Sequence, residues 1–427
     1  MAWDASQYLG KGWAWTHYCA PEFLFKFQGF TWLEPLPEVG MFAVYAGMFV
    51  AGALIALGAY YRAAITFFFL AHTYAFLLSA SQYLNHAYLI SLIAFLLIWM
   101  PANRCLSVDA WRKPELRAKP TPRWARATLQ GQVAVVYVFG AIAKLNPDWL
   151  AGVPIGQWLQ HSAERNPLIG DLVAAPEVVP LVLWGGILFD LLIVPALVWR
   201  RTRVLAVLVS LGFHVSNSVL FEIGVFPWMM LGATTLFFAA DWPRKVPGLR
   251  ALFDEWEPPP TASGAPSRWL WLPLALWFAV QVGLPLRHHV YPGDVAWTEE
   301  GHPFAWRMKL RSKRGRATFR VRDPETGHEW RVYPEDELQP RQAHKMAGRP
   351  DLILQYAHHL AELEGERLGH PVEVRADAFV SLNYRPPQRF IDPEVDLTTR
   401  ELSLRAYDWI LPFTWTPAPS VLDHANE

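Results

Sequence analysis

The chain has 427 residues with 38 basic and 38 acidic side chains, so no net charge points to nucleic acid as a partner. Hydrophobic residues make up 52% and aromatic residues 14%, and long apolar runs recur between residues 41 and 286. The two cysteines, Cys19 and Cys105, exclude a disulfide framework and lack the spacing of a metal site.

Apolar stretches in the first part of the chain predict membrane-spanning helices. A span needs about 20 mostly apolar residues. The stretches are residues 41–60, 63–80, 84–100, 131–145, 178–198, 204–223, 225–240 and 269–286. We therefore expect residues 1–290 to form a polytopic α-helical bundle of about 8 spans, integral to the membrane and in contact with its lipid.

The distribution of Lys and Arg predicts the orientation of this bundle. Residues 103–129 carry seven Lys or Arg, and residues 200–203 carry three. Loops at the other ends of the spans carry almost none. Because basic loops stay in the cytoplasm, the chain that follows the last span should lie on the non-cytoplasmic side.

Several polar residues fall at the non-cytoplasmic ends of the predicted spans: His86, Lys144, His214 and Asn217. Asp190 lies nearer the middle of the membrane. Each has a purely structural interpretation, since a lysine can snorkel to the interface and a histidine or aspartate can bond to a neighbouring helix. Their common depth, and the cost of polar groups in hydrocarbon, favour a functional site equally well.

Residues 291–427 predict a small, soluble α+β domain with a mainly antiparallel sheet. Alternating residues predict strands, and apolar periodicity predicts two helices. The expected strands are 304–313, 316–323, 328–334 and 372–385, with 401–409 as a further candidate, and the helices are 340–346 and 350–368.

Basic residues recur along the first of these strands, at Arg307, Lys309, Arg311 and Lys313. Their alternation across both faces favours a solvated sheet surface. The alternative is an anion-binding face for a substrate that carries a carboxylate.

Several stretches resemble one known family. NHAYLI with ANRCLSVD, GQVAVVYVFGAIAKLNPDWL, FHVSNSVLFEIGVFPWMML and DWPRK are similar to the transmembrane domain of the vitamin K-dependent γ-glutamyl carboxylases and of related bacterial proteins. WRMKLRSKRGRATFRVRDPETGHEW and VSLNYRPPQRFIDPEVDL resemble the lumenal domain of the same enzymes. The resemblance covers most of the chain, with both domains in the same order.

The resemblance implies a peptidyl-glutamate 4-carboxylase, a carbon–carbon lyase. Its co-substrates would be reduced vitamin K (the hydroquinone), O2 and CO2, and a glutamate-containing peptide would be the partner. Lys144 matches the lysine of the K-L-x-x-D-W motif, the base that takes a hydroquinone proton and is kept neutral by burial. Oxidation of the quinone to its epoxide then drives removal of a γ-proton, and the carbanion captures CO2. No metal site is expected.

The resemblance also implies roles for other residues. His86 joins Lys144 as a catalytic residue, and quinone binding falls to Asn85, His214 and Asn217. The positions implied for substrate binding are Trp306, Met308 and Arg389.

The sequence departs from the family in three ways. Ala143 stands before Lys144, where lysine pairs also occur in the family. The animal enzymes extend well beyond the equivalent of residue 427, so a reduced propeptide site is expected. A further apolar helix usually precedes the position of Tyr18.

Two alternative functions remain. The first is a quinone epoxidase, oxidase or quinone-binding membrane protein without peptide carboxylation. The second is a non-catalytic membrane protein whose outer domain binds a partner. Retention of Lys144, His86 and the whole outer domain argues against the second.

Overall fold

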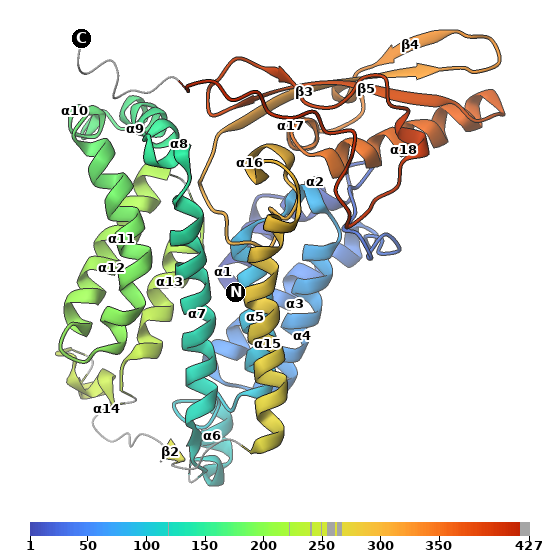
Figure 1. Cartoon of the computed structure of the whole chain (residues 1–427). Helices are drawn as coiled ribbons and strands as arrows, with labels where there is room; N and C mark the ends of the chain where they lie inside the picture. Colours follow the sequence, from blue (N-terminus) through green and yellow to red (C-terminus); the bar gives the residue numbers. More distant parts are fainter. Residues whose placement is uncertain are drawn as a thin grey trace.

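The computed structural model describes residues 1–117, 119–221, 223–239, 241–248, 250–253, 261–262 and 267–418. A bundle of helices makes up the first part of the chain, and a sheet domain lies across one end of it (Figure 1). Glu222, Ala240 and residues 419–427, which fall within predicted spans or the predicted soluble domain, lie outside the described residues.

The predicted apolar stretches coincide with the long helices of the bundle. Leucine, valine, alanine and phenylalanine dominate these segments, and their backbone groups bond within each helix, as a membrane requires. The helices are α3 (Glu38–Leu57), α4 (Tyr61–Leu77), α5 (Asn85–Trp99), α7 (Arg123–Lys144), α11 (Val178–Val198), α12 (Arg203–Phe221), α13 (Phe226–Thr234) and α15 (Arg268–Leu286).

Four of these helices face outward with apolar side chains. Among the described residues, α3, α11, α12 and α15 are long and apolar enough to cross a membrane. At most 39% of the apolar window in each is buried within the protein. Such large exposed apolar surfaces fit lipid and not water, which confirms the prediction of a membrane protein. The predicted number of spans stays a prediction.

Shorter helices and 3₁₀ turns connect the longer elements of both domains. The α-helices are α1 (Ala2–Gly10), α2 (Trp13–Tyr18), α6 (Val108–Arg112), α8 (Pro147–Leu150), α9 (Val153–Arg165), α10 (Gly170–Ala174), α14 (Arg250–Phe253) and α16 (Val295–Thr298). The 3₁₀ turns are η1 (Ala80–Gln82), η2 (Pro114–Leu116), η3 (Thr235–Phe237), η4 (Trp242–Lys245), η5 (Arg287–Val290), η6 (Pro334–Asp336) and η7 (Leu397–Thr399). Two short strands, β1 (Thr121–Pro122) and β2 (Thr261–Ala262), pair in parallel.

The sheet domain has an antiparallel sheet in the order β4-β3-β5-β6. Its strands are β3 (Lys313–Arg322), β4 (Glu329–Val332), β5 (Glu373–Leu382) and β6 (Gln388–Arg389). Helices α17 (Pro340–Ala347) and α18 (Pro350–Leu368) follow β4. Alternate residues of β5 are fully buried, including Val374 and Val380, and pack with α18 in one core. The predicted antiparallel α+β domain is confirmed.

Two of the predicted strands were wrong. Residues 304–312 form an irregular segment before β3, because Phe304, Trp306 and Lys309 all have a positive φ that a strand does not allow. Residues 401–409 form no strand either, and only an isolated bridge joins Ile391 to Ile410. Alternation of residue types in both segments reflects contacts with other parts of the protein and not strand pairing.

The sheet domain is fixed to the bundle by hydrogen bonds from α18 and the residue before it. Gln355 bonds both backbone groups of Lys26, at 2.7 and 3.1 Å. The Arg349 guanidinium donates to the carbonyl of Ala80 at 2.9 Å. These contacts hold the underside of the sheet domain against the bundle ends where the predicted polar residues lie.

Candidate active site

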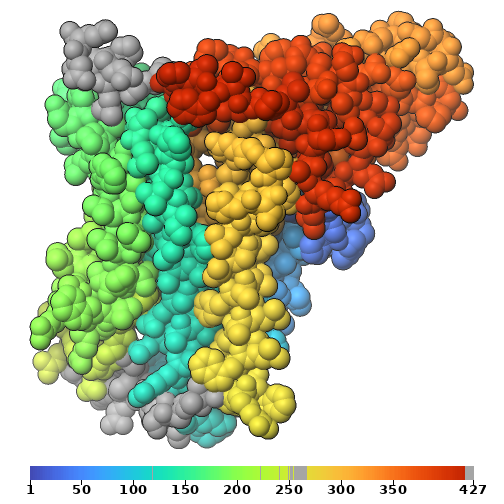
Figure 2. Space-filling view, in the orientation of Figure 1, coloured from blue at the N-terminus to red at the C-terminus, as the bar shows by residue number. Residues whose placement is uncertain are grey.

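A cavity of about 460 Å³ lies between the helical bundle and the sheet domain. Its floor comes from α5, α7, α11 and α12, and its roof comes from residues 299–313 and from α17 and the loop that follows it. Figure 2 shows a narrow gap between α7 and α15 just below the sheet domain. The cavity therefore lies between the polar ends of the helices and the underside of the sheet domain.

Lys144 lies on the floor, as the last residue of α7. The helix ends there because Leu145 leaves helical geometry and Asn146 begins α8, accepting the N–H of Trp149 at 3.0 Å. The Lys144 ammonium forms a short ion pair with Asp190 of α11, and only 12% and 9% of the two side chains are exposed. Lys144 therefore faces the cavity as half of a buried pair, and the snorkelling interpretation is wrong.

Two glycines make room for this pair. A Cβ at Gly140, one turn before Lys144, would lie 3.0 Å from a carboxylate oxygen of Asp190. A Cβ at Gly186, one turn before Asp190, would touch the lysine side chain at 3.7 Å. Glycine at these positions lets α7 and α11 approach closely while their charged side chains meet between them.

His214 and Asn217 line the same floor from α12. His214 is buried, and its Nε2 lies 3.0 Å from the hydroxyl of Tyr137 on α7. Within the described residues Asn217 makes no hydrogen bond, so its amide can bind a ligand. Aromatic rings, among them Phe213 and Phe221, complete this apolar wall.

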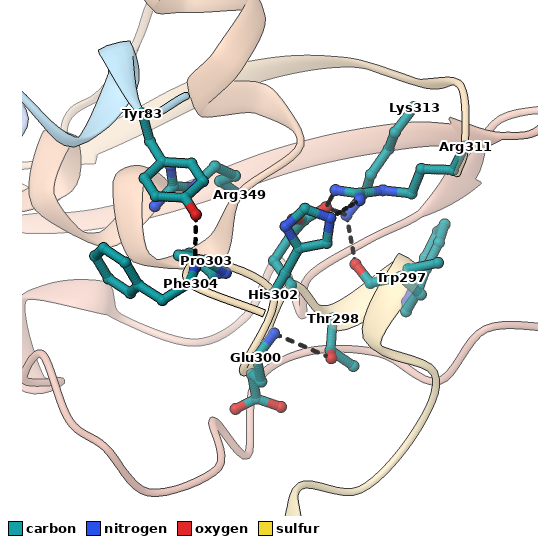
Figure 3. A network of polar contacts seen from close by, with 12 residues as sticks. Tyr83, Trp297, Thr298, Glu300, His302, Pro303, Phe304, Arg311, Lys313 and Arg349 are labelled. Carbon is teal, nitrogen blue, oxygen red and sulfur yellow. Dashed lines mark hydrogen bonds and ion pairs between the residues drawn. The ribbon is translucent and has the colours of Figure 1, made fainter. Parts of the chain in front are cut away.

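The start of α5 supplies another polar wall, with Asn85 and His86. The Tyr83 hydroxyl donates to the Asn85 side chain at 2.9 Å and accepts the backbone N–H of Phe304 at 2.8 Å. Figure 3 shows Tyr83 directed toward Phe304 in this contact. The wall is therefore bonded to the irregular segment that forms the roof.

The roof is built around one buried carboxylate, Glu299. Arg311 and Lys313 both form ion pairs with it, the second at 3.1 Å, and Lys313 also donates to the carbonyl of Trp297 (Figure 3). Burial would raise the pKa of Glu299, but Arg311 and Lys313 outweigh burial and hold it well below its ordinary value. Glu299 is therefore an anion at neutral pH.

Cations outnumber anions in this roof. Arg307 and Lys345 also line the cavity, and among the described residues neither forms an ion pair with an acidic side chain. Burial, with Arg311 nearby, lowers the pKa of Arg307 to about 10. Burial and Arg311 also lower the pKa of Lys313 to about 8, against the opposite effect of Glu299. The roof is therefore a crowded cationic surface that an anion would stabilise.

The prediction that the basic residues of the 304–313 segment lie on a solvated sheet surface is wrong. All of them line the cavity: Arg307, Lys309, Arg311 and Lys313. The irregular backbone of residues 304–312 crosses over the floor without strand pairing, and Lys313 begins β3 at the end of it.

Most of the predicted site residues are brought together in this cavity. Those that line it are Asn85, His86, Lys144, His214, Asn217 and Met308. Trp306 lies outside the lining and is fully buried, with its ring stacked on Tyr88 at 5.1 Å between ring centroids. Arg389 is also outside it, on β6, where it pairs with Asp377 at 2.8 Å.

Sequence reasoning missed two groups of this site. For Asp190 the sequence indicates only a polar residue within a membrane span. Its contact with Lys144 could have been inferred from Gly140 and Gly186, each of which lies one turn before a member of the pair. Glu299 carried no signal, because EEGH reads as an ordinary polar loop. Within the described ranges no group of three or more His, Cys, Asp or Glu side chains could hold a metal ion.

Two family models match the chain. The HTTM domain matches residues 1–242, more than half of the chain. The lumenal domain of the vitamin K-dependent gamma-carboxylase matches residues 266–416. No solved structure matches the chain.

Proposed function

We propose a function from the premise that the chain belongs to the vitamin K-dependent gamma-carboxylase family, to which both matched domains point. In this proposal the protein adds CO2 to the γ-carbon of peptide glutamate, coupled to oxidation of vitamin K hydroquinone to its epoxide by O2. The observation that carries it is the buried Lys144–Asp190 pair in the floor of a cavity with a cationic roof.

The residues of the floor fit a hydroquinone. Aromatic and aliphatic side chains such as Phe213 and Val136 suit a flat apolar ring, and Asn217 and His86 offer polar groups to its oxygens. The bound hydroquinone would supply the strong base that removes the γ-proton. Lys144, His214 and Asn217 would hold it in place from two helices.

Lys144 acts at its Nζ in this proposal. The ion pair with Asp190 is the state after proton transfer: before it, Lys144 as the free amine takes a proton from a hydroquinone hydroxyl in the cavity. Asp190 then faces an ammonium and stabilises it as an ion pair. Because both side chains are nearly buried, water competes little for either the amine or the carboxylate.

The roof binds the substrate's carboxylates. Within the described part of the chain Arg307 and Lys345 form no ion pair, so a glutamate side chain can bind them without displacing a carboxylate that is already paired. A glutamate bound there would lie on the opposite side of the cavity from the residues proposed to hold the hydroquinone. This arrangement favours a carboxylase over a quinone epoxidase, which needs no cationic roof.

The membrane arrangement is part of the same proposal. Residues 1–290 form the multi-pass domain with about eight spans of roughly 20 residues each, and residues 291–427 form the soluble domain. Basic loops such as that at Arg104 and Arg112 lie in the cytoplasm, and the cavity lies at the opposite membrane surface.

The test is a product assay on purified protein in lipid. Labelled CO2, vitamin K hydroquinone, O2 and a short glutamate peptide are supplied, and both peptide label and vitamin K epoxide are measured. Label together with epoxide is the expected result. Epoxide without label would instead support the quinone epoxidase, and neither product from folded protein would contradict both functions.

A further inference from the structure

Asp148 is bonded across the boundary between the bundle and the sheet domain. It lies in α8, one turn after Lys144. Both of its carboxylate oxygens accept from the Arg385 guanidinium, at 2.6 and 2.7 Å, and Asn383 donates to it at 2.6 Å. The Arg385 side chain has no exposed surface, and that of Asp148 is only 13% exposed.

The loop that supplies these donors follows β5 and has an unusual backbone. Asn383 and Tyr384 have φ values of 51° and 65°, in the left-handed region. Asparagine tolerates this conformation, but tyrosine adopts it only where neighbouring contacts hold it. The backbone is therefore held in a conformation that directs Asn383 and Arg385 together toward Asp148.

Asn383 also bonds the start of the cationic roof. Its Oδ1 accepts the N–H of Ser312 at 2.8 Å, and its own N–H donates to the Ser312 carbonyl at 2.7 Å. Ser312 stands between Arg311 and Lys313, the two cations that hold Glu299. One residue of the loop thus contacts both the turn after Lys144 and the roof.

The charge of Asp148 strengthens this connection. Burial raises the pKa of Asp148, but the hydrogen bonds from Arg385 and Asn383 outweigh burial and hold it below its ordinary value. Hydrogen bonds to a charged group are about twice as strong as neutral ones, and a bidentate arginine fixes direction as well as distance.

We infer that Asp148, Asn383 and Arg385 form a positioning latch that fixes Lys144 relative to the cationic roof. The inference rests on the proposed function. The base formed at the quinone has to meet a γ-proton held by the roof, and a misplacement of about 1 Å can cost a reaction about 100-fold. The latch therefore couples quinone oxidation to carboxylation, although none of its residues lines the cavity.

The test compares Asp148→Asn, Arg385→Gln and the milder Asn383→Gly with the unaltered protein. Glycine accepts the left-handed backbone, so Asn383→Gly removes side-chain contacts with little strain. The measured quantities are the ratio of epoxide formed to CO2 fixed, and the KM for the peptide. We expect the ratio to rise about tenfold or more in each folded variant.

The matched control is Glu337→Gln. Glu337 accepts from Tyr356 at 2.8 Å and from His359 at 2.5 Å, entirely within the sheet domain. It should lower thermal stability and leave the product ratio unchanged. A latch variant that behaves like this control would show a merely structural role and overturn the inference.

A double-mutant cycle, measured by melting temperature, tests the contact between Asp148 and Arg385 without an activity assay. Asp148→Asn and Arg385→Gln should each lower the melting temperature, and the double variant should lower it little further, because the same contact is lost. Additive losses would contradict the latch. If the unaltered protein forms neither product, the proposed function fails, while this cycle still decides whether the two parts are coupled here.

Discussion

At the scale of single residues, the site depends on buried charges that are paired with one another. Lys144 and Asp190 form such a pair inside the bundle, and the cost of burying both is offset only while both are present. Sequence position alone allowed Lys144 to snorkel. The cavity and the partner on α11 place it where the proposed function needs a proton acceptor.

Asp190→Asn tests the partner of the proposed base. The amide still accepts an N–H from Lys144 but no longer balances an ammonium, so we expect epoxide formation to fall about 100-fold, within the range of general-base contributions. The initial rate of epoxide formation is the measurement. Asp171→Asn, an exposed change on α10, is the control, and equal rates in the two variants would remove Asp190 from the mechanism.

The pKa of Lys313, near 8, predicts a pH dependence of substrate binding. Above that pH the roof loses one positive charge, so the KM for the glutamate peptide should rise. Lys313→Arg should keep the KM constant to higher pH, because arginine stays charged. An identical pH profile for both proteins would show that Lys313 does not set the charge of the roof.

The lowered pKa of Lys313 also predicts that the fold becomes more stable as pH rises, whereas substrate binding becomes weaker. The folded pKa of about 8 is below the ordinary 10.5, so the unfolded chain holds this proton more tightly. The contribution of Lys313 therefore destabilises the fold fully below pH 8 and less as pH rises toward 10.5. The melting temperature of Lys313→Met should not rise with pH in this range. If it still rises, another titrating group causes the increase in stability.

At the scale of elements, the segment before β3 shows where sequence reasoning failed. Its alternating residues resembled a strand, yet Trp306 packs on Tyr88 of α5 and the basic residues turn toward the cavity. Alternation is a local signal, and it cannot distinguish pairing with a strand from packing against a helix of another part of the chain.

Trp306 tests the packing of this segment. Among the described residues its buried indole N–H has no hydrogen-bond partner, so Trp306→Phe loses no hydrogen bond, but the smaller ring leaves a gap and should lower the free energy of unfolding by less than the alanine change does. Trp306→Ala should cost about 3–5 kcal/mol. Denaturant unfolding measures both, and a raised peptide KM in the folded phenylalanine variant would support the prediction that Trp306 takes part in substrate binding.

At the scale of the whole molecule, the helices were predictable and the contacts between distant parts were not. Hydropathy is local, so each apolar stretch coincided with a helix. The Lys144–Asp190 contact joins positions 46 apart, and Asp148 and Arg385 are separated by 237. No spacing rule reaches that far, and only the folded chain brings these pairs together.

The orientation of the molecule is open to direct measurement. A reporter fused after Asp323 should lie on the non-cytoplasmic side, because basic loops hold the other end of the bundle in the cytoplasm. A reporter after Arg117, inside a basic loop, is the cytoplasmic control. A cytoplasmic signal after Asp323 would place the cavity at the wrong membrane surface.

The central claim is that Lys144 starts the reaction in the cavity below the cationic roof. Purified Lys144→Ala is compared with the control Lys245→Ala for epoxide formation and labelled CO2 fixation. In the unaltered protein Lys245 forms an exposed ion pair with Asp241. We predict that Lys144→Ala loses both products while folded, and that Lys245→Ala keeps both. Normal epoxide and label from Lys144→Ala would contradict the account, because the base would then be another group.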